Sequence, residues 1–508
     1  MEILFISKNE DKRKEIKRIF ESCSKELDFD IIIKTVENVD GIESLKELQE
    51  KDIEKVLKYK LTEIYKIVKR PILVEHTGLE LECLNGYPGS QTQLFWGSLA
   101  KKDEINRVEI GKSIYDIADS FSEYGAKATT YLGFCDGKKI ITTKGEVCGT
   151  ICQPKGNSKF QWDVVFKPKN LDKTFAELSE KNEKDKYSMR TIAIKNLINE
   201  IKENSKQYDY LKKYNTYKEV AKQIASDIKN EKLMVFVGAG VSRNVGMPSW
   251  GGLISKLGEE LGYDSDVFFN LGDFLELAEY YTILKNEEFQ IYKNNKDSVF
   301  SKIKEHLGVS EENLKNRIND SIFCESFYDF LNLGIKKVYT TNYDSLIENT
   351  INIWNGKKNV DIKFDSIYNL KTMNDARETN INIIKLHGDL REVENIVLNQ
   401  SSYFDRYDFE SCLDIQLRAD MLKKSILFLG YSFSDINIKY MFHKLNKLWD
   451  DIDDCKRTES YIFLTENNEV QKKILEKNKM IPIICNELDK REGIIKFLNT
   501  IVEEFNKL

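Results

Sequence analysis

The sequence predicts an α/β protein, and two observations support this fold class. Residues 233–237 (LMVFV) form an apolar, β-rich run that breaks into Gly238-Ala239-Gly240 and then into a helical stretch. Residues 337–344, 383–389 and 425–435 repeat this design, because each is an apolar run that ends in Gly, Asn, His or Ser. A length of 508 residues is enough for two to four domains.

The four strand ends are expected to share one binding crevice. In an open α/β sheet, ligands bind outside the carboxyl ends of the strands. The glycine turn at residues 238–242 would let backbone N–H groups approach a phosphate. A tight structural turn has the same local pattern, and the third glycine of the usual dinucleotide fingerprint is replaced by Arg243. Each segment alone could be a turn or a cap, but four together favour a ligand site.

These segments contain the motifs GAGVS with a downstream GMPSW, TTNYD, KLHGD and FLGYSFSD, over about residues 220–508. In this order the motifs resemble the sirtuin family. The resemblance implies a Rossmann-like domain with a helical insertion, Asn342 and His387 acting at the nicotinamide ribose, and NAD contacts from Gly238, Ala239, Gly240, Ser242, Asp344, Gly430 and Ser432. A core histidine is the alternative for His387. TTNYD, in place of the TQNID of deacetylases, is similar to a divergent bacterial branch found in antiviral defence proteins.

The cysteine content separates two activities within that family. Protein-deacylating sirtuins carry a structural zinc site of two Cys pairs after the catalytic His. After His387 this chain has only Cys412, Cys455 and Cys485, which are too widely spaced for paired thiolate ligands. The implied activity is therefore that of an NAD glycohydrolase (NADase), in which water attacks C1′ of the ribose. His387, with an ordinary pKa of about 6.5, would accept a proton.

The first 203 residues contain a second ordered set of motifs: SKNEDK, PILVEHTGLELECLNGYPGS, FQWDVVFKP, TFAEL and EKDKYSMR. In this order they resemble the inosine triphosphate pyrophosphatase family, which handles noncanonical purine nucleotides. The resemblance implies a mixed-sheet domain with a nucleotide site formed by Ser7, Asn9, Lys12, Lys60, His76, Phe160, Trp162, Asp163, Lys184, Ser188 and Arg190. It also implies Glu47, in a segment similar to the family's E-I-Q, as a Mg²⁺ ligand.

Two departures from this family bear on catalysis. The family's acidic residue in VEDTGL is His76, and its base-contacting His is Met189. Magnesium prefers oxygen ligands, so His76 should weaken the binding of the metal and its water. Because the aromatic pair, Asp163 and the cations remain, we expect a domain that binds a purine triphosphate but hydrolyses it poorly or not at all. Two alternatives stay open: these residues only hold the inherited fold, or His76 acts as a residual base.

The composition limits the kinds of binding partner that we expect. The formal charge is −6, from 77 basic and 83 acidic residues, and no basic field indicates nucleic-acid binding. No apolar run approaches the roughly 20 residues that a membrane helix needs. Nine cysteines without a disulfide framework, and no secretory leader, predict a cytoplasmic protein.

We therefore expect a two-domain sensor–effector. Residues 1–203 would detect dITP or ITP, residues 204–230 would form a helical connector, and residues 231–508 would hydrolyse NAD. The pairing resembles bacterial antiphage systems of the Kongming type, which implies antiviral defence through abortive infection. Family analogy implies a homo-oligomer, either a dimer or a tetramer. The alternative is a housekeeping pyrophosphatase with an NAD-binding regulatory domain.

Overall fold

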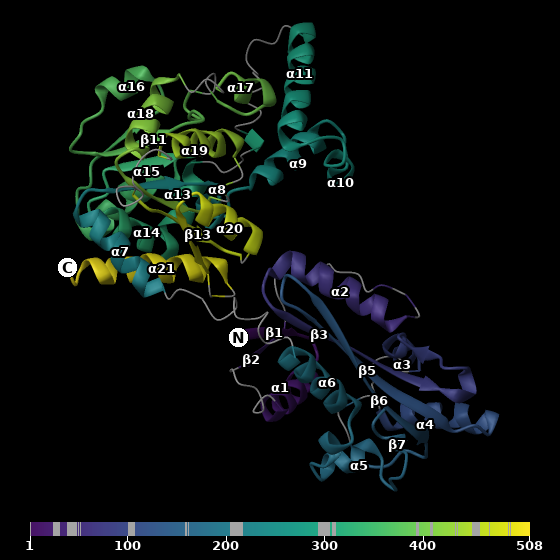
Figure 1. The fold of residues 1–508 in the computed structure, drawn as a ribbon. Helices are drawn as coiled ribbons and strands as arrows, with labels where there is room; N and C mark the ends of the chain where they lie inside the picture. The colour runs from purple at the N-terminus through teal and green to yellow at the C-terminus, as the bar shows by residue number, and fades with distance from the viewer. Residues whose placement is uncertain are drawn as a thin grey trace. The chain divides into compact units, whose positions relative to one another are not determined.

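The chain forms two compact units, residues 1–214 and residues 215–508 (Figure 1). The computed structural model describes residues 2–23, 31–37, 48, 50, 52–99, 107–157, 160, 162–203, 217–292, 305–306, 311–392, 396–406, 410–431, 433, 435–449, 458–466, 468–485, 487 and 489–508. The division falls within the predicted connector, residues 204–230. The described part of that connector forms helix α7 (Tyr217–Lys229), which belongs to the second unit.

The first unit is built on a mixed seven-stranded sheet of order β2-β1-β3-β5-β6-β7, with β4 paired to β3. The pairs β1–β2 and β1–β3 are parallel, and the remaining pairs are antiparallel. The strands are β1 (Glu2–Ile6), β2 (Ile32–Val36), β3 (Ile72–Leu81), β4 (Pro88–Gly89), β5 (Gly125–Cys135), β6 (Ile140–Ile151) and β7 (Phe166–Pro168).

Helices cover both faces of this sheet (Figure 1). Leu132 and Phe134 of β5 share a core with α1 and α6, whereas Gly133 between them lies against Leu57 and Leu61 of α2. Because successive strand residues face opposite sides, α1 and α6 cover one face and α2 covers the other. The helices are α1 (Glu10–Cys23), α2 (Ile53–Val68), α3 (Thr92–Ser98), α4 (Arg107–Phe121), α5 (Phe175–Glu180) and α6 (Met189–Glu203), with short 3₁₀ turns η2 (Glu82–Leu84) and η3 (Lys184–Lys186).

The second unit is built on a fully parallel seven-stranded sheet of order β10-β11-β9-β8-β12-β13-β14. The strands are β8 (Leu233–Val237), β9 (Lys337–Thr340), β10 (Phe364–Ile367), β11 (Ile381–Lys385), β12 (Ser425–Leu429), β13 (Ser460–Leu464) and β14 (Met480–Ile484). Every residue of β8, β12 and β13 is buried, as expected where helices cover both faces of a parallel sheet. The predicted fold class is confirmed in both units.

Two helical layers enclose this parallel sheet (Figure 1). One core joins odd-numbered residues of β8 to α7, α14, α15 and α21, and the other joins even-numbered residues to α18, α19 and α20. The helices are α8 (Ala239–Arg243), α9 (Trp250–Glu260), α10 (Ser265–Phe268), α11 (Phe274–Tyr292), α13 (Glu311–Asn319), α14 (Ile322–Leu331), α15 (Leu346–Lys358), α16 (Leu370–Asp375), α17 (Gln400–Phe404), α18 (Cys412–Met421), α19 (Ile436–Trp449), α20 (Glu469–Lys477) and α21 (Lys490–Phe505).

The helical insertion has a small core of its own. Leu253 and Leu257 of α9 pack with Phe268, Ala278 and Tyr281 of α10 and α11. The same cluster includes two residues of the segment after His387, Ile396 and Leu398, and α11 also accepts hydrogen bonds from α17. The insertion is thereby fixed against the segment that follows β11.

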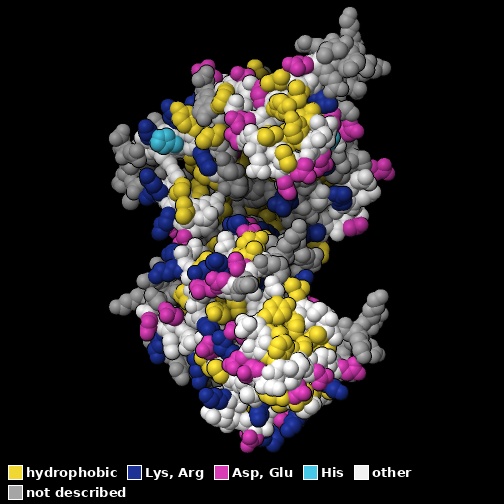
Figure 2. Space-filling view, turned by 90° about the vertical axis from the view of Figure 1, so that its right-hand side faces the viewer, with side chains coloured by type: hydrophobic (Ala, Val, Ile, Leu, Met, Phe, Trp, Pro, Cys, Tyr) yellow, Lys and Arg dark blue, Asp and Glu magenta, His cyan; other side chains and the backbone are white. Residues whose placement is uncertain are grey.

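The surface mixes charges of both signs. On the face drawn in Figure 2, basic and acidic side chains are interspersed, between patches of hydrophobic side chains. Among the helices that the structure describes, none combines the length and the apolar character required to cross a membrane.

Candidate active site and candidate nucleotide site

The four strands singled out from the sequence are neighbours in the second sheet, in the order β11-β9-β8-β12. They are parallel, so their carboxyl ends lie along one edge. Gly238, Asn342, His387 and Gly430 each follow one of these strands. The structure therefore brings the predicted catalytic residues and the glycine turn to the same edge of the sheet.

The glycine turn is explained by the packing of β8 against β12. The N–H of Gly238 donates to Leu429 O at 2.9 Å, and that of Gly240 donates to Gly430 O at 2.8 Å. A Cβ added to Gly238 would lie 2.5 Å from Gly430 O, and a Cβ added to Gly240 would lie 2.7 Å from the same oxygen. Ala239 begins α8, which is only five residues long. The close approach of the two backbones is by itself a sufficient reason for glycine at these positions. Contacts between this turn and the NAD phosphates stay a prediction.

Asn342 is held in a chain of side-chain hydrogen bonds. Its Nδ2 donates to Ser242 Oγ at 3.0 Å, and Ser242 Oγ donates to Asp344 Oδ2 at 2.8 Å. The Asn342 backbone N–H donates to Thr340 Oγ1, which in turn donates to Val237 O. Both Asn342 and Ser242 are buried. This network joins the ends of β8 and β9 and fixes the amide of Asn342.

His387 lies in a buried, polar environment. Its side chain is almost fully enclosed, and this burial lowers the pKa of its imidazole to about 4, although the nearby Asp435 carboxylate acts to raise it. Nε2 of His387 lies 3.7 Å from Asp435 Oδ2, and its ring meets Tyr403 edge-on at 5.2 Å between centroids. The imidazole is therefore neutral near pH 7 and can accept a proton.

A buried lysine connects the Asn342 segment to the His387 segment. Nζ of Lys385 donates to the backbone oxygen of Asp344 at 2.7 Å and pairs with Glu348 at 3.0 Å and Asp389 at 2.6 Å. All three charged side chains are buried, and Lys385 is fully enclosed. The sequence analysis did not identify this cluster, although Lys385 and Asp389 flank His387 in the KLHGD motif.

In the first unit, the predicted base-binding residues come together around Phe160. Trp162 meets the Phe160 ring at 5.2 Å in an edge-on arrangement, and Lys184 Nζ lies 4.7 Å from the same ring centre. Lys184 also bonds Asp163 at 2.7 Å. Trp162 is buried in the core, and its Nε1 has no hydrogen-bond partner among the described residues. Ser188 Oγ accepts from the Arg190 N–H and is fully buried.

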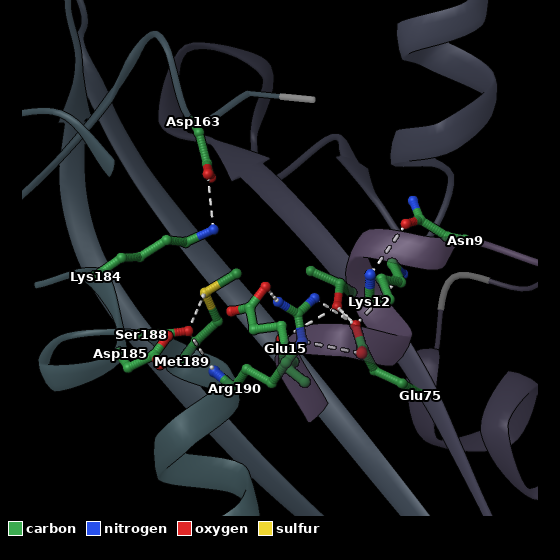
Figure 3. Close-up of polar contacts among 12 residues, drawn as sticks. Asn9, Lys12, Glu15, Glu75, Asp163, Lys184, Asp185, Ser188, Met189 and Arg190 are labelled. Atoms are coloured by element: carbon green, nitrogen blue, oxygen red, sulfur yellow. Dashed lines mark hydrogen bonds and ion pairs between the residues drawn. The ribbon is translucent and has the colours of Figure 1, made fainter. Parts of the chain in front are cut away.

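Arg190 is the centre of a buried ion network (Figure 3). Its Nε and Nη2 donate to the two oxygens of Glu75 at 3.0 and 2.8 Å, and its Nη1 lies 2.6 Å from Glu15. Lys12 adds a contact of 3.3 Å to Glu75. Burial acts to raise the pKa of Glu75, but Arg190 and Lys12 outweigh it and hold that pKa well below its usual range. The network joins α1, β3 and α6.

Glu75 and Glu15 are functional candidates that the sequence analysis missed. Glu75 directly precedes His76 in the VEHTGL motif, so the sequence already placed it next to a predicted site residue. Glu15 lies beside Ile16 and one turn before Ile19, on the buried side of α1. A carboxylate beside these apolar residues was the available signal, because a buried charge requires a partner.

The other residues predicted for the nucleotide site divide into separate groups. Ser7 Oγ accepts from Asn9 N, and Asn9 Oδ1 accepts from Lys12 N, so the SKNEDK turn caps α1. Lys60 lies on α2, on the other face of the sheet. His76 follows Glu75 in β3 and therefore faces the side opposite to Glu75. Its Nε2 lies 2.9 Å from the carbonyl oxygen of Ser90.

The described residues do not fit a resident Mg²⁺. The carboxylates of Glu75 and Glu15 are already paired with Arg190, and no group of described His, Cys, Asp and Glu residues has the arrangement of a metal site. An imidazole nitrogen at His76 replaces the oxygen donor that Mg²⁺ prefers. Glu47, predicted as a ligand, lies outside the described residues, as does Ser432 of the predicted NAD site.

Comparison with known proteins finds a different family match for each of the two units. Residues 3–200 match the model of the Ham1 family, and residues 336–483 match that of the SIR2-like domain. The inosine triphosphate pyrophosphatase of Yarrowia lipolytica is 33% identical over 147 residues, covering 28% of this chain and 72% of that protein. The solved structure of the Staphylococcus aureus Ham1 protein is 22% identical, with a TM-score of 0.33, and covers 40% of this chain and 100% of that one.

The second unit has relatives of a different kind. A protein of Cytobacillus dafuensis named NAD(+) hydrolase ThsA is 25% identical over 311 residues, covering 57% of each chain. The chain spans between 41% and 57% of the length of the relatives that carry this name. Both resemblances read from the sequence motifs are confirmed. The chain belongs to the Ham1 family through its first unit, and its second unit contains a SIR2-like domain.

Proposed function

We propose that the second unit hydrolyses NAD to nicotinamide and ADP-ribose. The observation that carries this proposal is the placement of Asn342 and His387 after adjacent parallel strands, at the edge where such sheets bind ligands. The name NAD(+) hydrolase ThsA, which several relatives carry, supports the same activity.

The two residues suit the reaction. Nδ2 of Asn342 is used by Ser242, so its amide oxygen is left to orient a ribose hydroxyl or the attacking water. The bond electrons of C1′–N leave with neutral nicotinamide, water forms the new bond to C1′, and one proton is released. Neutral His387 accepts that proton and passes it to solvent. The transferred group carries an oxocarbenium-like charge, so positioning contributes more than a strong acid would.

Water, rather than an acyl-lysine, is the proposed acceptor. The cysteines after His387 do not form the two pairs that hold zinc in protein-deacylating sirtuins. A protein deacylase remains the competing activity for this site, and it predicts NAD cleavage only in the presence of an acylated peptide.

For the first unit we propose recognition of dITP or ITP with little or no hydrolysis. Phe160, Trp162, Asp163 and Lys184 form a compact aromatic and charged cluster that suits a purine base. His76 and the paired state of Glu75 disfavour a metal-activated water. Mg²⁺ would therefore arrive with the phosphates of the nucleotide. A housekeeping pyrophosphatase with a regulatory NAD site is the alternative.

Together these proposals describe a bacterial antiviral effector. Binding of the noncanonical nucleotide would shift the population toward an active state, and loss of NAD would cause abortive infection. A homo-oligomer, dimer or tetramer, and a cytoplasmic location belong to the same proposal. Fusion of the recognition unit and the cleavage unit in one chain raises their effective concentration, so no separate docking affinity is required.

The decisive experiment measures nicotinamide release by the purified full chain, alone and with ATP, ITP or dITP plus Mg²⁺. We expect release only with an inosine nucleotide, and its loss in Asn342→Ala but not in the control Asn332→Ala, which changes an exposed asparagine at the end of α14. Pyrophosphate release, measured in parallel, should be restored or increased by His76→Asp. Intact NAD under all conditions, with pyrophosphate formed from ITP, would instead favour the housekeeping enzyme.

A further inference from the structure

Asp435 occupies a position between a helix and the candidate catalytic histidine. Its Oδ1 accepts the backbone N–H groups of Asn437 at 2.8 Å and Ile438 at 3.2 Å, at the start of α19. Its Oδ2 faces the site, 3.2 Å from the hydroxyl of Tyr403 and 3.7 Å from Nε2 of His387. One oxygen of this carboxylate thus serves the fold, and the other faces the site.

Among the residues that the structure describes, the charges around His387 leave Asp435 without a cation. Arg406 also faces the imidazole, but it is paired with Asp414, so the two charges oppose each other. Among the described residues, Asp435 makes no ion pair with lysine or arginine. The remaining groups around it are the phenols of Tyr343, Tyr403 and Tyr431, and burial together with Asp435 raises the pKa of each phenol.

A largely buried carboxylate without a cation has a natural counter-ion in an imidazolium. His387 is neutral in the resting site and becomes positive when it accepts a proton. Asp435 would then be the nearest opposite charge, in a site of low polarity where such an interaction is strong. Tyr403 fixes this geometry, because its hydroxyl bonds Asp435 and its ring meets the edge of His387.

We propose that Asp435 is a positioning residue for NAD cleavage: it orients His387 through Nε2 and stabilises the imidazolium that forms during the reaction, while Tyr403 holds Asp435 in place. This inference rests on the proposed NAD hydrolysis. A proton favoured on Nε2 leaves Nδ1 as the nitrogen that accepts the proton from ribose or water. Tyr403 lies on α17, in the segment that follows His387.

The test compares Asp435→Asn with Asp489→Asn in the full chain. Asp489 caps α21 through the same pair of backbone bonds, at 2.8 and 3.4 Å, so its substitution controls for the loss of a charged cap. Asparagine can still cap a helix, so the fold should persist in both variants. We expect kcat/KM for nicotinamide release to fall at least about ten-fold in Asp435→Asn, within the range of acid–base effects, and to stay unchanged in Asp489→Asn.

The pH profile separates positioning from general damage. Asp435 raises the pKa of His387, so removing its charge should move the acid limb of kcat/KM to lower pH. An unchanged rate and an unchanged acid limb in Asp435→Asn would overturn the inference. A merely structural role would lower the rate without moving the limb, which also overturns it.

A second measurement keeps this inference separate from the NADase proposal. The chain has only four histidines, so the imidazole of His387 can be followed by NMR in the histidine-labelled full chain. A lower His387 pKa in Asp435→Asn, with no change in Asp489→Asn, supports the coupling even if the wild type fails to cleave NAD. An unchanged pKa would refute it whatever the activity.

Discussion

At the scale of single residues, the burial of His387 has a measurable consequence. Burial lowers the pKa of its imidazole from 6.5 to about 4, so the folded protein keeps this side chain neutral where an exposed histidine would be charged. If neutral His387 accepts the proton, the acid limb of kcat/KM for NAD cleavage should lie near pH 4 to 5 rather than near 6.5. Initial rates of nicotinamide release between about pH 4 and 8 measure this limb.

The same shift fixes the sign of the stability change with pH. The unfolded chain takes up a proton near pH 6.5, whereas the folded chain does so only near pH 4, so the folded state loses stability as the pH falls through this window. Rates must therefore be read where the fold persists. An acid limb near pH 6.5 in folded protein would show that a different group limits the reaction. His443→Gln, which removes an exposed histidine, is the control and should leave the acid limb of kcat/KM unchanged.

At the scale of elements, the turn from β8 into α8 depends on contact with the end of β12. A Cβ added at Gly240 would lie 2.7 Å from the carbonyl oxygen and 2.9 Å from Cα of Gly430, and backbone atoms cannot rotate away. We expect Gly240→Ala to lower the free energy of unfolding by about 1 to 3 kcal/mol, as overpacking does. Thermal unfolding of the full chain measures the change.

A matched glycine inside a helix provides the control for this turn. Gly356 lies in α15, and an added Cβ meets nothing within 4 Å. Gly356→Ala should raise the free energy of unfolding by about 0.5 to 1 kcal/mol, because alanine loses less backbone entropy. Equal effects of the two substitutions would contradict the packing explanation.

The elements also show which features a sequence can predict. Continuous apolar runs ending in Gly, Asn or His were enough to place four strand ends at one edge, because a parallel sheet has a fixed direction. The buried pairs were not predictable in this way. Arg190 and Glu75 are 115 residues apart and meet only when α6 packs on the sheet that contains β3. Lys385 reads as an exposed strand end until α15 covers it.

At the scale of the whole molecule, each unit has its own sheet and its own hydrophobic clusters. Recognition and cleavage can therefore be separated by experiment. Residues of the first unit should control the response to the nucleotide, and Asn342 should control only the chemistry. This separation is what a sensor–effector requires, whereas a housekeeping enzyme would place catalysis in the first unit.

Ligand-induced stabilisation tests this separation without reference to catalysis. A ligand that binds only the folded state at 100 times its Kd stabilises that state by about 2.7 kcal/mol. For a unit of about 200 residues this corresponds to roughly 5 to 10 °C in melting temperature.

We expect ITP or dITP to produce such a shift in the full chain and in Asn342→Ala. The shift should be absent in Lys184→Met, which removes the cation beside Phe160 and Asp163. Each variant is compared with its own ligand-free melting temperature, because breaking the buried Lys184–Asp163 pair is itself destabilising. An equal shift with ATP would show that the first unit does not distinguish inosine from adenine, and the sensing proposal would then fail even if NAD cleavage were real.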